Sequence, residues 1–366
     1  MTASGDFCAN EERKGIHVRM KRLLALLMMM TCLAPFALGE TVSMTFVGDC
    51  TIGCDVDWLE DERAFPNVIA REGMNYPFAN VRHLFEEDDL TVINLEGVLA
   101  DDDTGIMGGR KYNFRGETAY TKMLTDASVE LAVLGNNHAF DFGRPGHEST
   151  KAALTQAGIG YAYNDEPYIF EKNGVRIGML SYLADAYSER MKRMPEIIRA
   201  LREEEGCAAV VVCVHAGTEY KLRRSSGQRG FAHAAINAGA DLYIGHHPHV
   251  LQGLEVYQNR NIVYSLGNFV FGGNRRILSE HKHTMVARVE MTFEAGVYTG
   301  QRLTIHPAIA TGTLDRNNYQ PYLATGEEAK EVMRILNKDS KPDPEPYVEG
   351  VGAVQMWLGA DGTQEE

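Results

Sequence analysis

Short apolar runs and amphipathic stretches alternate along most of the chain. Seven apolar runs predict buried strands, at residues 42–48, 90–95, 129–135, 176–182, 209–215, 241–245 and 262–266. Between them, apolar residues recur three or four positions apart, which predicts helices at 79–86, 118–127, 148–157, 195–204 and 228–238. This alternation is typical of βαβ units that build a parallel or mixed sheet.

The pattern changes after Met285. Residues 289–293 alternate between apolar and polar side chains, which predicts antiparallel strands and therefore a second or mixed sheet. Gly158 and Gly239 follow two of the predicted helices, and glycine commonly ends a helix. We therefore expect an α/β protein. From residue 337 the chain is rich in Asp, Lys, Pro, Glu and Gly, and we expect a loosely held extension there.

The first 39 residues differ from the rest of the chain. Lys21 and Arg22 precede an apolar run, and a small-residue stretch ends at Gly39. These are the parts of a secretory signal peptide, so we expect cleavage after Gly39 and export from a bacterial cell. Since residues 1–19 are polar, Met20 can be the true start of the protein.

Two alternatives to a cleaved signal peptide stay open. A short membrane anchor fits less well, because the apolar run falls short of the roughly 20 residues that a spanning helix needs. Lipidation of Cys32 fits poorly with Thr31 before it.

Composition and charge narrow the possible functions. Hydrophobic residues make up 44% of the 366 residues, which is enough for a substantial core in one or two domains. The formal net charge is −14 without a long basic run, so we expect no nucleic-acid partner, which would require many cations. Cysteine is sparse: Cys50 and Cys54 flank a turn and can pair in an oxidising compartment, whereas Cys213 is typical of a core.

Side chains that can bind metals follow five of the predicted strands. They are Asp49, Asn94, Glu96, Asn137, His138, His215, His246, His247 and His249. Carboxylate, amide and imidazole ligands together suit Zn, Mn or Fe. Each residue alone also has a structural explanation, such as a turn aspartate or a buried, hydrogen-bonded histidine. Their joint occurrence at strand ends predicts a site for one or two divalent ions.

Six sequence blocks carry a family resemblance. They are TFVGDCTIG (45–53), VINLEGVL (92–99), LGNNHAFDFG (134–143), VHAGTEY (214–220), GADLYIGHHPHVLQG (239–253) and IVYSLGNFVF (262–271). In this order they resemble the motifs of the CapA family of capsule-synthesis proteins, which is linked to poly-gamma-glutamate. That family in turn resembles calcineurin-like metallophosphatases. The resemblance implies a four-layer α-β-β-α sandwich of the metallophosphatase type with two mixed sheets.

The resemblance also implies roles for individual residues. The implied metal ligands are Asp49, Glu96, Asn137, His215, His247 and His249. His246 is an extra histidine that we rank below the ligands. His138 is the implied catalytic group, which stabilises or protonates the leaving oxygen, and Asp141 three residues later can orient its imidazole. The metal would supply an activated water as the attacking group.

Two positions depart from the expected patterns. Thr51 stands where the phosphatases have the histidine of Asp-x-His, which thins the ligand shell of one metal. Ala216 stands where this family usually has tryptophan, and the missing indole can widen the pocket or weaken stacking on the substrate.

Further residues are candidates for substrate binding. Arg115 can bind an anionic group with two hydrogen bonds, or it can be a solvated surface arginine. Glu219 and Tyr220 follow His215 closely and either line the pocket or hold the loop. Because the protein is acidic, an acidic polymer would need local cations, and Arg223 and Arg224 are candidates beside Arg115.

These observations favour an exported, secreted or cell-surface protein of capsule or poly-gamma-glutamate synthesis. We expect a signal region at 1–39, a metallophosphatase-type domain at 40–320 that acts on a phosphoester or an anionic polymer, and an extension at 321–366. The alternative is a non-catalytic scaffold that assembles or exports an anionic polymer with capsule-synthesis membrane proteins. Retained ligands argue against a scaffold, and Thr51 argues for it. A nucleotidase fits less well, because the extension is too short for an adenine-binding domain.

Overall fold

The structure is a computed structural model that describes residues 39–184, 189–276, 281–313, 315–354, 357–361 and 364–365. The predictions about the signal peptide, Met20 and Cys32 lie outside this range. Among the described residues, no helix is both long and apolar enough to cross a membrane.

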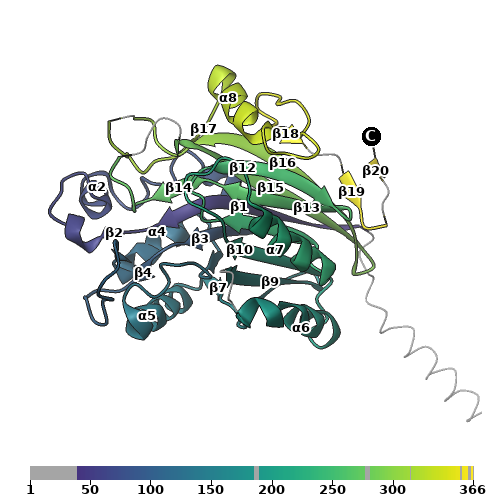
Figure 1. Cartoon of the computed structure of the whole chain (residues 1–366), viewed down its shortest axis with the longest axis horizontal. Coiled ribbons are helices and arrows are strands. Elements are labelled where there is room, and N and C mark those ends of the chain that lie inside the picture. Colours follow the sequence, from purple (N-terminus) through teal and green to yellow (C-terminus); the bar gives the residue numbers. More distant parts are fainter. Residues whose placement is uncertain are drawn as a thin grey trace, which may run out of the picture.

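The largest sheet combines parallel and antiparallel strands. Its strands are β1 (Glu40–Thr51), β3 (Leu90–Leu95), β6 (Leu131–Val133), β7 (Gly160–Ala162), β14 (Asn268–Phe271), β15 (His283–Glu294), β16 (Val297–Ile309), β17 (Tyr322–Leu323), β18 (Ala353–Val354), β19 (Trp357–Gly359) and β20 (Gln364–Glu365). The order is β20-β19-β16-β15-β1-β3-β6-β7, with β14 beside β1 and with β17 and β18 beside β16. β1 is parallel to β3 and β14 but antiparallel to β15, so this sheet is mixed (Figure 1).

A second mixed sheet and a small third sheet complete the strands. The second contains β8 (Tyr168–Lys172), β9 (Val175–Leu183), β10 (Ala209–His215), β11 (Leu242–His246), β12 (Leu251–Tyr257) and β13 (Arg260–Leu266), in the order β12-β13-β11-β10-β9-β8. Its four central strands are parallel and its two edge strands antiparallel. The third sheet contains β2 (Cys54–Asp55), β4 (Val98–Leu99) and β5 (Phe114–Gly116).

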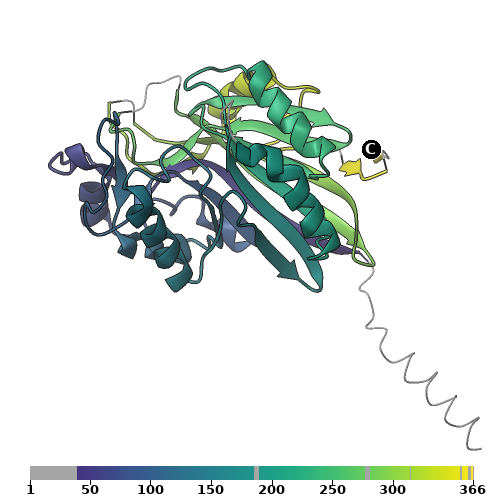
Figure 2. The same ribbon diagram turned by 60° about the horizontal axis from the view of Figure 1, so that its bottom comes forward.

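Helices flank the two large sheets. They are α2 (Phe65–Glu72), α3 (Arg82–Glu86), α4 (Thr121–Asp126), α5 (Gly143–Gln156), α6 (Glu189–Glu203), α7 (Ser226–Asn237) and α8 (Gly326–Asn337), with short 3-10 turns η1 (Val56–Trp58) and η2 (Thr118–Tyr120). Helices α2 to α5 share a buried cluster with the largest sheet, whereas α6 and α7 share one with the second sheet. Figure 2 shows α6 and α7 lying along that second sheet.

The largest core cluster lies between the two sheets. It joins Phe46 of β1 to Met179 of β9 and Val211 of β10, all almost fully buried. Burial of this many aliphatic side chains stabilises the face-to-face packing, because each fully buried one contributes about 1.5–3 kcal/mol relative to exposure. The packing also holds the ends of strands from both sheets next to each other.

The predicted elements agree with this structure in most places. The seven expected strands and five expected helices are confirmed, as is the antiparallel pairing of β15 with β16. The expected α/β class with mixed sheets is therefore confirmed. Gly158 and Gly239 lie just past α5 and α7 with φ of 76° and 106°, as helix-ending glycines do.

The expectation of a loosely held extension after residue 337 is wrong for the part of it that the structure describes. The Lys341 N–H donates to the Leu254 carbonyl at 2.7 Å, and β18 and β19 pair with β16. Before them, α8 buries Val332 and Leu336 in the largest core cluster. The polar side chains after residue 337 therefore lie on an exposed face. The backbone of this segment is hydrogen-bonded to the rest of the protein, and the apolar side of α8 before it packs in the core.

One glycine sets how closely two strand ends approach. A Cβ atom at Gly48 would lie 2.1 Å from the Gly267 carbonyl oxygen, a distance that no larger residue allows. The next residue, Asp49, donates its N–H to that same carbonyl at 2.8 Å. Gly48 therefore permits the contact that brings the turn between β13 and β14 against Asp49.

Candidate metal centre

The carboxyl ends of strands from both large sheets meet at one place. Asp49 is aligned with Asn94 on the neighbouring strand β3, and His215 is aligned with His246 on β11. Glu96 follows β3 directly and its N–H donates to the Cys50 carbonyl at 2.8 Å. Because strands that run in parallel end at the same edge, residues far apart in the sequence form one cluster.

Asp49 is a fully buried carboxylate with partners on both oxygens. Its Oδ1 accepts from Asn94 Nδ2 at 2.8 Å, and its Oδ2 lies 3.1 Å from His249 Nδ1 and 3.3 Å from the His247 N–H. Burial alone would raise the pKa of Asp49, but the hydrogen bond and charge of His249 hold that pKa below its usual range. Asp49 is therefore an anion at neutral pH.

Glu96 is also fully buried, yet it is left without hydrogen bonds. Within the described part of the chain, neither carboxylate oxygen has a hydrogen-bond partner. Three imidazole Nε2 atoms surround its Oε1, those of His215 at 3.6 Å, His249 at 3.8 Å and His138 at 4.0 Å. Burial raises the pKa of Glu96 well above its usual value. Although burial alone would lower the pKa of His249, the charges of Glu96 and Asp49 raise it to about 9, so one imidazolium offsets part of the charge of two carboxyl groups. The remaining cost of burying Glu96 is removed when a further cation binds.

A second set of donor atoms converges beside Glu96. His215 Nε2 lies 2.7 Å from Asn137 Oδ1 and 2.9 Å from His247 Nδ1. Burial, together with the nearby His247, lowers the pKa of His215 well below its usual value, and burial also lowers that of His247. Both imidazoles are therefore neutral at pH 7 and keep lone pairs for a cation.

Backbone strain marks the loop that carries the last two histidines. His247 has a φ of 98° and His249 a φ of 57°, in the left-handed region that residues other than glycine rarely adopt. The Pro248 carbonyl between them accepts from the Tyr220 N–H at 2.8 Å, and Asn268 Oδ1 lies 2.9 Å from His249 Nδ1. These contacts hold both imidazoles toward the carboxylates at a conformational cost, which is typical of functional sites.

These donors can hold a metal ion. Ligand atoms of Asp49, Glu96 and His249 lie within 4.8 Å of one another, and so do those of Glu219, His247 and His249. The unpartnered Glu96 carboxylate is the group that a cation would satisfy. The available oxygen and nitrogen donors suit Zn, Mn or Fe.

No cysteine in the described part of the chain contributes a thiolate to this site. Cys50 and Cys54 are buried free thiols, so the alternative of a disulfide between them is wrong. The Cys50 thiol points to the Gly48 carbonyl at 3.4 Å, and burial raises its pKa far above the usual value. His246 also points away, with its Nε2 at 3.2 Å from the Val47 carbonyl, in agreement with its lower rank.

His138 faces Glu96 with its Nε2, at 4.0 Å from Oε1, and is held by Asp141 and Phe114. Its Nδ1 is 2.7 Å from Asp141 Oδ2, and the ring of Phe114 packs against its imidazole at 4.2 Å between centroids. Asp141 is fully buried and also accepts from the Phe114 N–H and from Arg110, both at 2.7 Å. Asp141 therefore fixes the ring so that Nε2 faces the cluster.

The predicted substrate residues divide into two groups. Glu219 and Tyr220 lie at the rim, where the Tyr220 ring is 6.0 Å from that of His249 and stacks on His281 at 4.7 Å. Arg115 instead donates to the Ala100 carbonyl at 2.9 Å and pairs with Asp103 at 3.1 Å. Its guanidinium also lies 5.9 Å from the centre of the Phe142 ring, so the described contacts of Arg115 are to the protein itself.

Other residues of the site were missed or underrated in the sequence. Arg110 follows a Gly/Asp-rich loop and gives no motif signal, yet it bonds both Asp141 and the Asn137 carbonyl at 2.8 Å. Asn136 donates to Asn94 Oδ1 at 3.1 Å and to the Leu95 carbonyl at 2.8 Å, which ties two strand ends together. The Asn-Asn-His run was the available signal for Asn136.

The chain is similar to proteins of capsule synthesis. The model of the family described as Bacterial capsule synthesis protein PGA_cap matches residues 43–273. Capsule biosynthesis protein CapA of Bacillus anthracis is 31% identical over 257 residues, 64% of this chain and 60% of that protein. PGA biosynthesis protein CapA of Bacillus subtilis (strain 168) is 30% identical over 251 residues, 63% of this chain and 64% of that protein. The chain therefore spans less than two thirds of the length of these relatives.

A solved structure of a hypothetical protein from Thermus thermophilus is similar over 73% of this chain and 99% of that one. The two are 15% identical, with a TM-score of 0.44.

Proposed function

Since the chain belongs to the bacterial capsule synthesis protein family PGA_cap, we propose that it works in the synthesis of an anionic capsule polymer through a metal-dependent, phosphoesterase-type site. The substrate in this proposal is a phosphoester or a polymer such as poly-gamma-glutamate. The proposal includes a metallophosphatase-type sandwich as the fold that carries the site. The names of the two CapA relatives support the role in capsule or polymer synthesis.

The unpartnered Glu96 carboxylate is the observation that carries the catalytic part of the proposal. Its two oxygens are buried without a hydrogen bond in the described structure, among imidazoles at 3.6–4.0 Å. A protein that used this cluster only for packing would gain stability from an apolar residue at this position. Retention of the carboxylate is explained when it binds a cation.

Each residue of the cluster has a defined part in the proposed reaction. Asp49, Glu96, Asn137, His215, His247 and His249 would hold one or two ions of Mn, Fe or Zn. A bound divalent ion activates water near neutral pH and neutralises charge on the attacked group. His138 would hold the proton for the leaving oxygen at Nε2, because Asp141 binds its Nδ1 at 2.7 Å. Glu219 and Tyr220 would contact the substrate at the rim.

A non-catalytic scaffold is the second candidate, and one observation favours it. Thr51 stands where the phosphatase pattern has a histidine ligand, and its buried Oγ1 has no hydrogen-bond partner in the described structure. In this case the metal would stabilise a surface that assembles or exports an anionic polymer together with capsule-synthesis membrane proteins.

Metal content distinguishes the two functions in combination with activity. The purified chain from residue 40 onward is measured by inductively coupled plasma mass spectrometry, beside His247→Ala/His249→Ala and the control His83→Ala/His233→Ala, which removes two imidazoles outside the cluster. We expect about one or two equivalents of metal in the wild type and the control, and loss in the first variant. A screen of phosphoesters and gamma-glutamyl polymers then tests hydrolysis. Metal without hydrolysis supports the scaffold, and absence of metal after reconstitution contradicts the metal site itself.

Export is a separate part of the proposal. The full sequence expressed in a bacterium should give a protein outside the cytoplasm whose first residue is Glu40. Intact mass and N-terminal sequencing of the fractionated protein check this, and a cytoplasmic product that starts at Met1 or Met20 contradicts it.

A further inference from the structure

A basic cavity lies between the start of α7 and the end of α8. It has a volume of about 360 Å³, and the charged residues that line it are Arg223, Arg224, Arg229, Lys338, Lys341 and Asp339. Five cations and one carboxylate in one cavity contrast with the net charge of −14 of the whole chain. The local field there therefore attracts anions that the rest of the surface repels.

One of these cations is used by the protein itself. The Arg224 side chain donates to the Asp339 carbonyl, lies 3.4 Å from the Asp339 carboxylate and 3.7 Å from Glu255, and stacks over the Tyr264 ring at 4.7 Å. The Arg224 N–H also donates to Asp339 Oδ2 at 2.8 Å. Arg224 therefore neutralises the single carboxylate of the cavity and holds α8 to the loop before α7.

The remaining cations are available to a ligand. Among the residues that the structure describes, Arg223, Lys338 and Lys341 form no ion pair, and Lys341 is fixed only through its backbone. Arg229 lies 3.7 Å from Glu255 with 59% of its side chain exposed. The cavity thus offers three free cations and one loosely paired cation to an anion with several charges.

The cavity is connected to the metal centre by one short loop. His215 belongs to the metal centre, Tyr220 lies at its rim, and Arg223 follows three residues later. Three residues span at most roughly 10 Å. By standard bond lengths a gamma-linked glutamate unit extends over roughly 6 Å, so a few units reach from the cavity to the rim of the centre.

We propose that this basic cavity binds the carboxylates of an acidic polymer and positions that polymer beside the metal centre. The inference rests on the proposed function for the identity of the polymer as a chain of gamma-linked glutamate. Regularly spaced carboxylates match a group of separate cations, because each lysine or arginine can pair with a different unit. The cavity is a binding site, and the chemistry stays at the metal centre.

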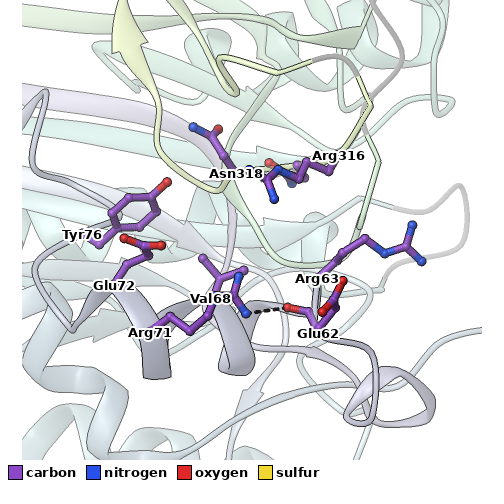
Figure 3. A pocket seen from close by; sticks show the side chains of 9 residues that line it. Glu62, Arg63, Val68, Arg71, Glu72, Tyr76, Arg316 and Asn318 are labelled. Carbon is purple, nitrogen blue, oxygen red and sulfur yellow. Dashed lines mark hydrogen bonds between the residues drawn. The ribbon is translucent and has the colours of Figure 1, made fainter.

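A second charged cavity, of about 250 Å³, differs from the basic cavity in the balance of its charges (Figure 3). It is lined by Arg63, Arg71 and Arg316, but also by Glu62 and Glu72. Figure 3 shows Arg71 bonded to the backbone of Glu62. Arg71 donates to the Glu62 carbonyl at 2.7 Å, and Arg63 pairs with Asp61 at 2.7 Å. Here the charges are nearly balanced and two of the three cations already have partners.

The test compares the two cavities directly. Binding of a fluorescein-labelled gamma-linked glutamate oligomer is measured by fluorescence anisotropy at low and at physiological salt. The variants are Arg223→Ala/Lys338→Ala/Lys341→Ala and, as control with the same change of charge, Arg63→Ala/Arg71→Ala/Arg316→Ala. We expect the first variant to bind about tenfold more weakly and with a smaller salt dependence, and the control to change by less than about twofold. Thermal melting checks that both variants fold.

Several outcomes would overturn the inference. Equal weakening by both variants would mean that only the total charge matters, and unchanged binding in the first variant would exclude the cavity. Tighter binding of a single-stranded oligonucleotide than of the glutamate oligomer would assign the cavity to nucleic acid instead.

The metal-site variant His247→Ala/His249→Ala separates this inference from the proposed function. It should lose metal but keep most of its oligomer binding, since the cavity residues are intact. Loss of oligomer binding in that variant would place the polymer at the metal centre and contradict the inference. If the wild type takes up no metal after reconstitution but still binds the oligomer through Arg223, the metal site is refuted and the inference stands.

Discussion

Buried carboxylates at the two ends of β11 differ in their hydrogen bonding. At the amino end, Asp241 is buried and both of its oxygens are hydrogen-bonded: Arg260 donates to Oδ1 at 3.0 Å, and Arg202 and the Val210 N–H donate to Oδ2. At the carboxyl end, Glu96 is buried among histidines without a hydrogen bond in the described structure.

This difference in hydrogen bonding distinguishes a buried carboxylate that stabilises the fold from one that is a candidate for ligand binding. Asp241 joins α6, β10 and β13 through Arg202, Val210 and Arg260, so its charge is compensated by the chain itself. Glu96 has no hydrogen bond, and the nearest compensating charge, on His249 at 3.8 Å, is shared with Asp49. A buried carboxylate whose partners are missing from the fold is therefore the better indicator of a ligand.

The largest effect is expected at the amino end. Asp241→Asn keeps the shape of the side chain but leaves Arg202 and Arg260 without their carboxylate, so the free energy of unfolding should fall by about 3 kcal/mol. Urea unfolding measures this. Asp126→Asn, which removes the exposed pair with Lys122, is the control and should cost less than about 0.5 kcal/mol. A loss of the same small size in both would show that the hydrogen bonds of Asp241 do not stabilise the fold.

Asp141 is a hydrogen-bonded buried carboxylate like Asp241, but it lies beside the candidate metal centre like Glu96. Asparagine has one accepting oxygen, so it cannot accept both from Arg110, which bonds Oδ1, and from His138 and Phe114, which bond Oδ2. It also lacks the negative charge that favours a proton on Nδ1 of His138. We expect Asp141→Asn to retain metal and to reduce hydrolysis by about 100-fold.

Nitrogen NMR shifts of His138 should report a changed tautomer in that variant. Loss of metal together with activity would instead show that Asp141 is needed to build the cluster. The shifts distinguish the two, because they do not depend on a substrate.

At Glu96 we expect the opposite effect on stability, an increase in the free energy of unfolding when the carboxylate is replaced. Burial raises the pKa of Glu96, so folding of the metal-free protein at neutral pH costs either the protonation of this carboxyl group or the burial of its charge. Glu96→Gln removes that cost, so the free energy of unfolding should rise by about 1 kcal/mol. Added Mn, Fe or Zn should then stabilise the wild type and not the variant. Melting curves with and without metal measure both effects. Destabilisation of the metal-free variant would mean that Glu96 is a structural residue like Asp241.

The smallest effect is expected at Glu130, which is only partly compensated. Burial raises the pKa of Glu130 to about 7, although its Oε2 accepts from the Thr91 N–H at 2.8 Å. The native state therefore binds more protons than the unfolded state between about pH 4.5 and pH 7, so stability falls as the pH rises through this range.

The variant Glu130→Gln should flatten this dependence, because the amide oxygen keeps the hydrogen bond without a charge. We expect it to equal the wild type at low pH and to exceed it by about 1 kcal/mol above neutral pH. Urea unfolding over a pH series checks the slope. An identical slope in both proteins would show that Glu130 is as well compensated as Asp241.

Most of the site was predictable because its residues follow strands. The apolar runs that end at Asp49, Glu96 and His215 are each long enough to identify a strand, and parallel strands must end at a common edge. The residues that support them were harder to find. Arg110 and Phe114 lie in a loop and a short strand whose sequence has no periodicity, so only the folded chain shows that they hold His138.

Local sequence was enough to predict the α/β class, the order of most strands and helices along the chain, and the residue types of the candidate metal cluster. These properties depend on local periodicity and on which residues follow each strand. The tertiary structure decided which buried groups are compensated. It leaves Glu96 without a hydrogen bond among the described residues, gives Asp141 three hydrogen bonds, and turns Arg115 toward Asp103.

The charged cavities also depend on the tertiary structure. Arg223 and Lys338 are more than one hundred positions apart in the sequence, so their joint cavity could not be predicted from spacing. Their approach depends on the packing of α8 against β12 and β16, which Arg224 reinforces through Asp339. Composition determines how many charges a chain carries, but three-dimensional packing determines which of them remain free to bind.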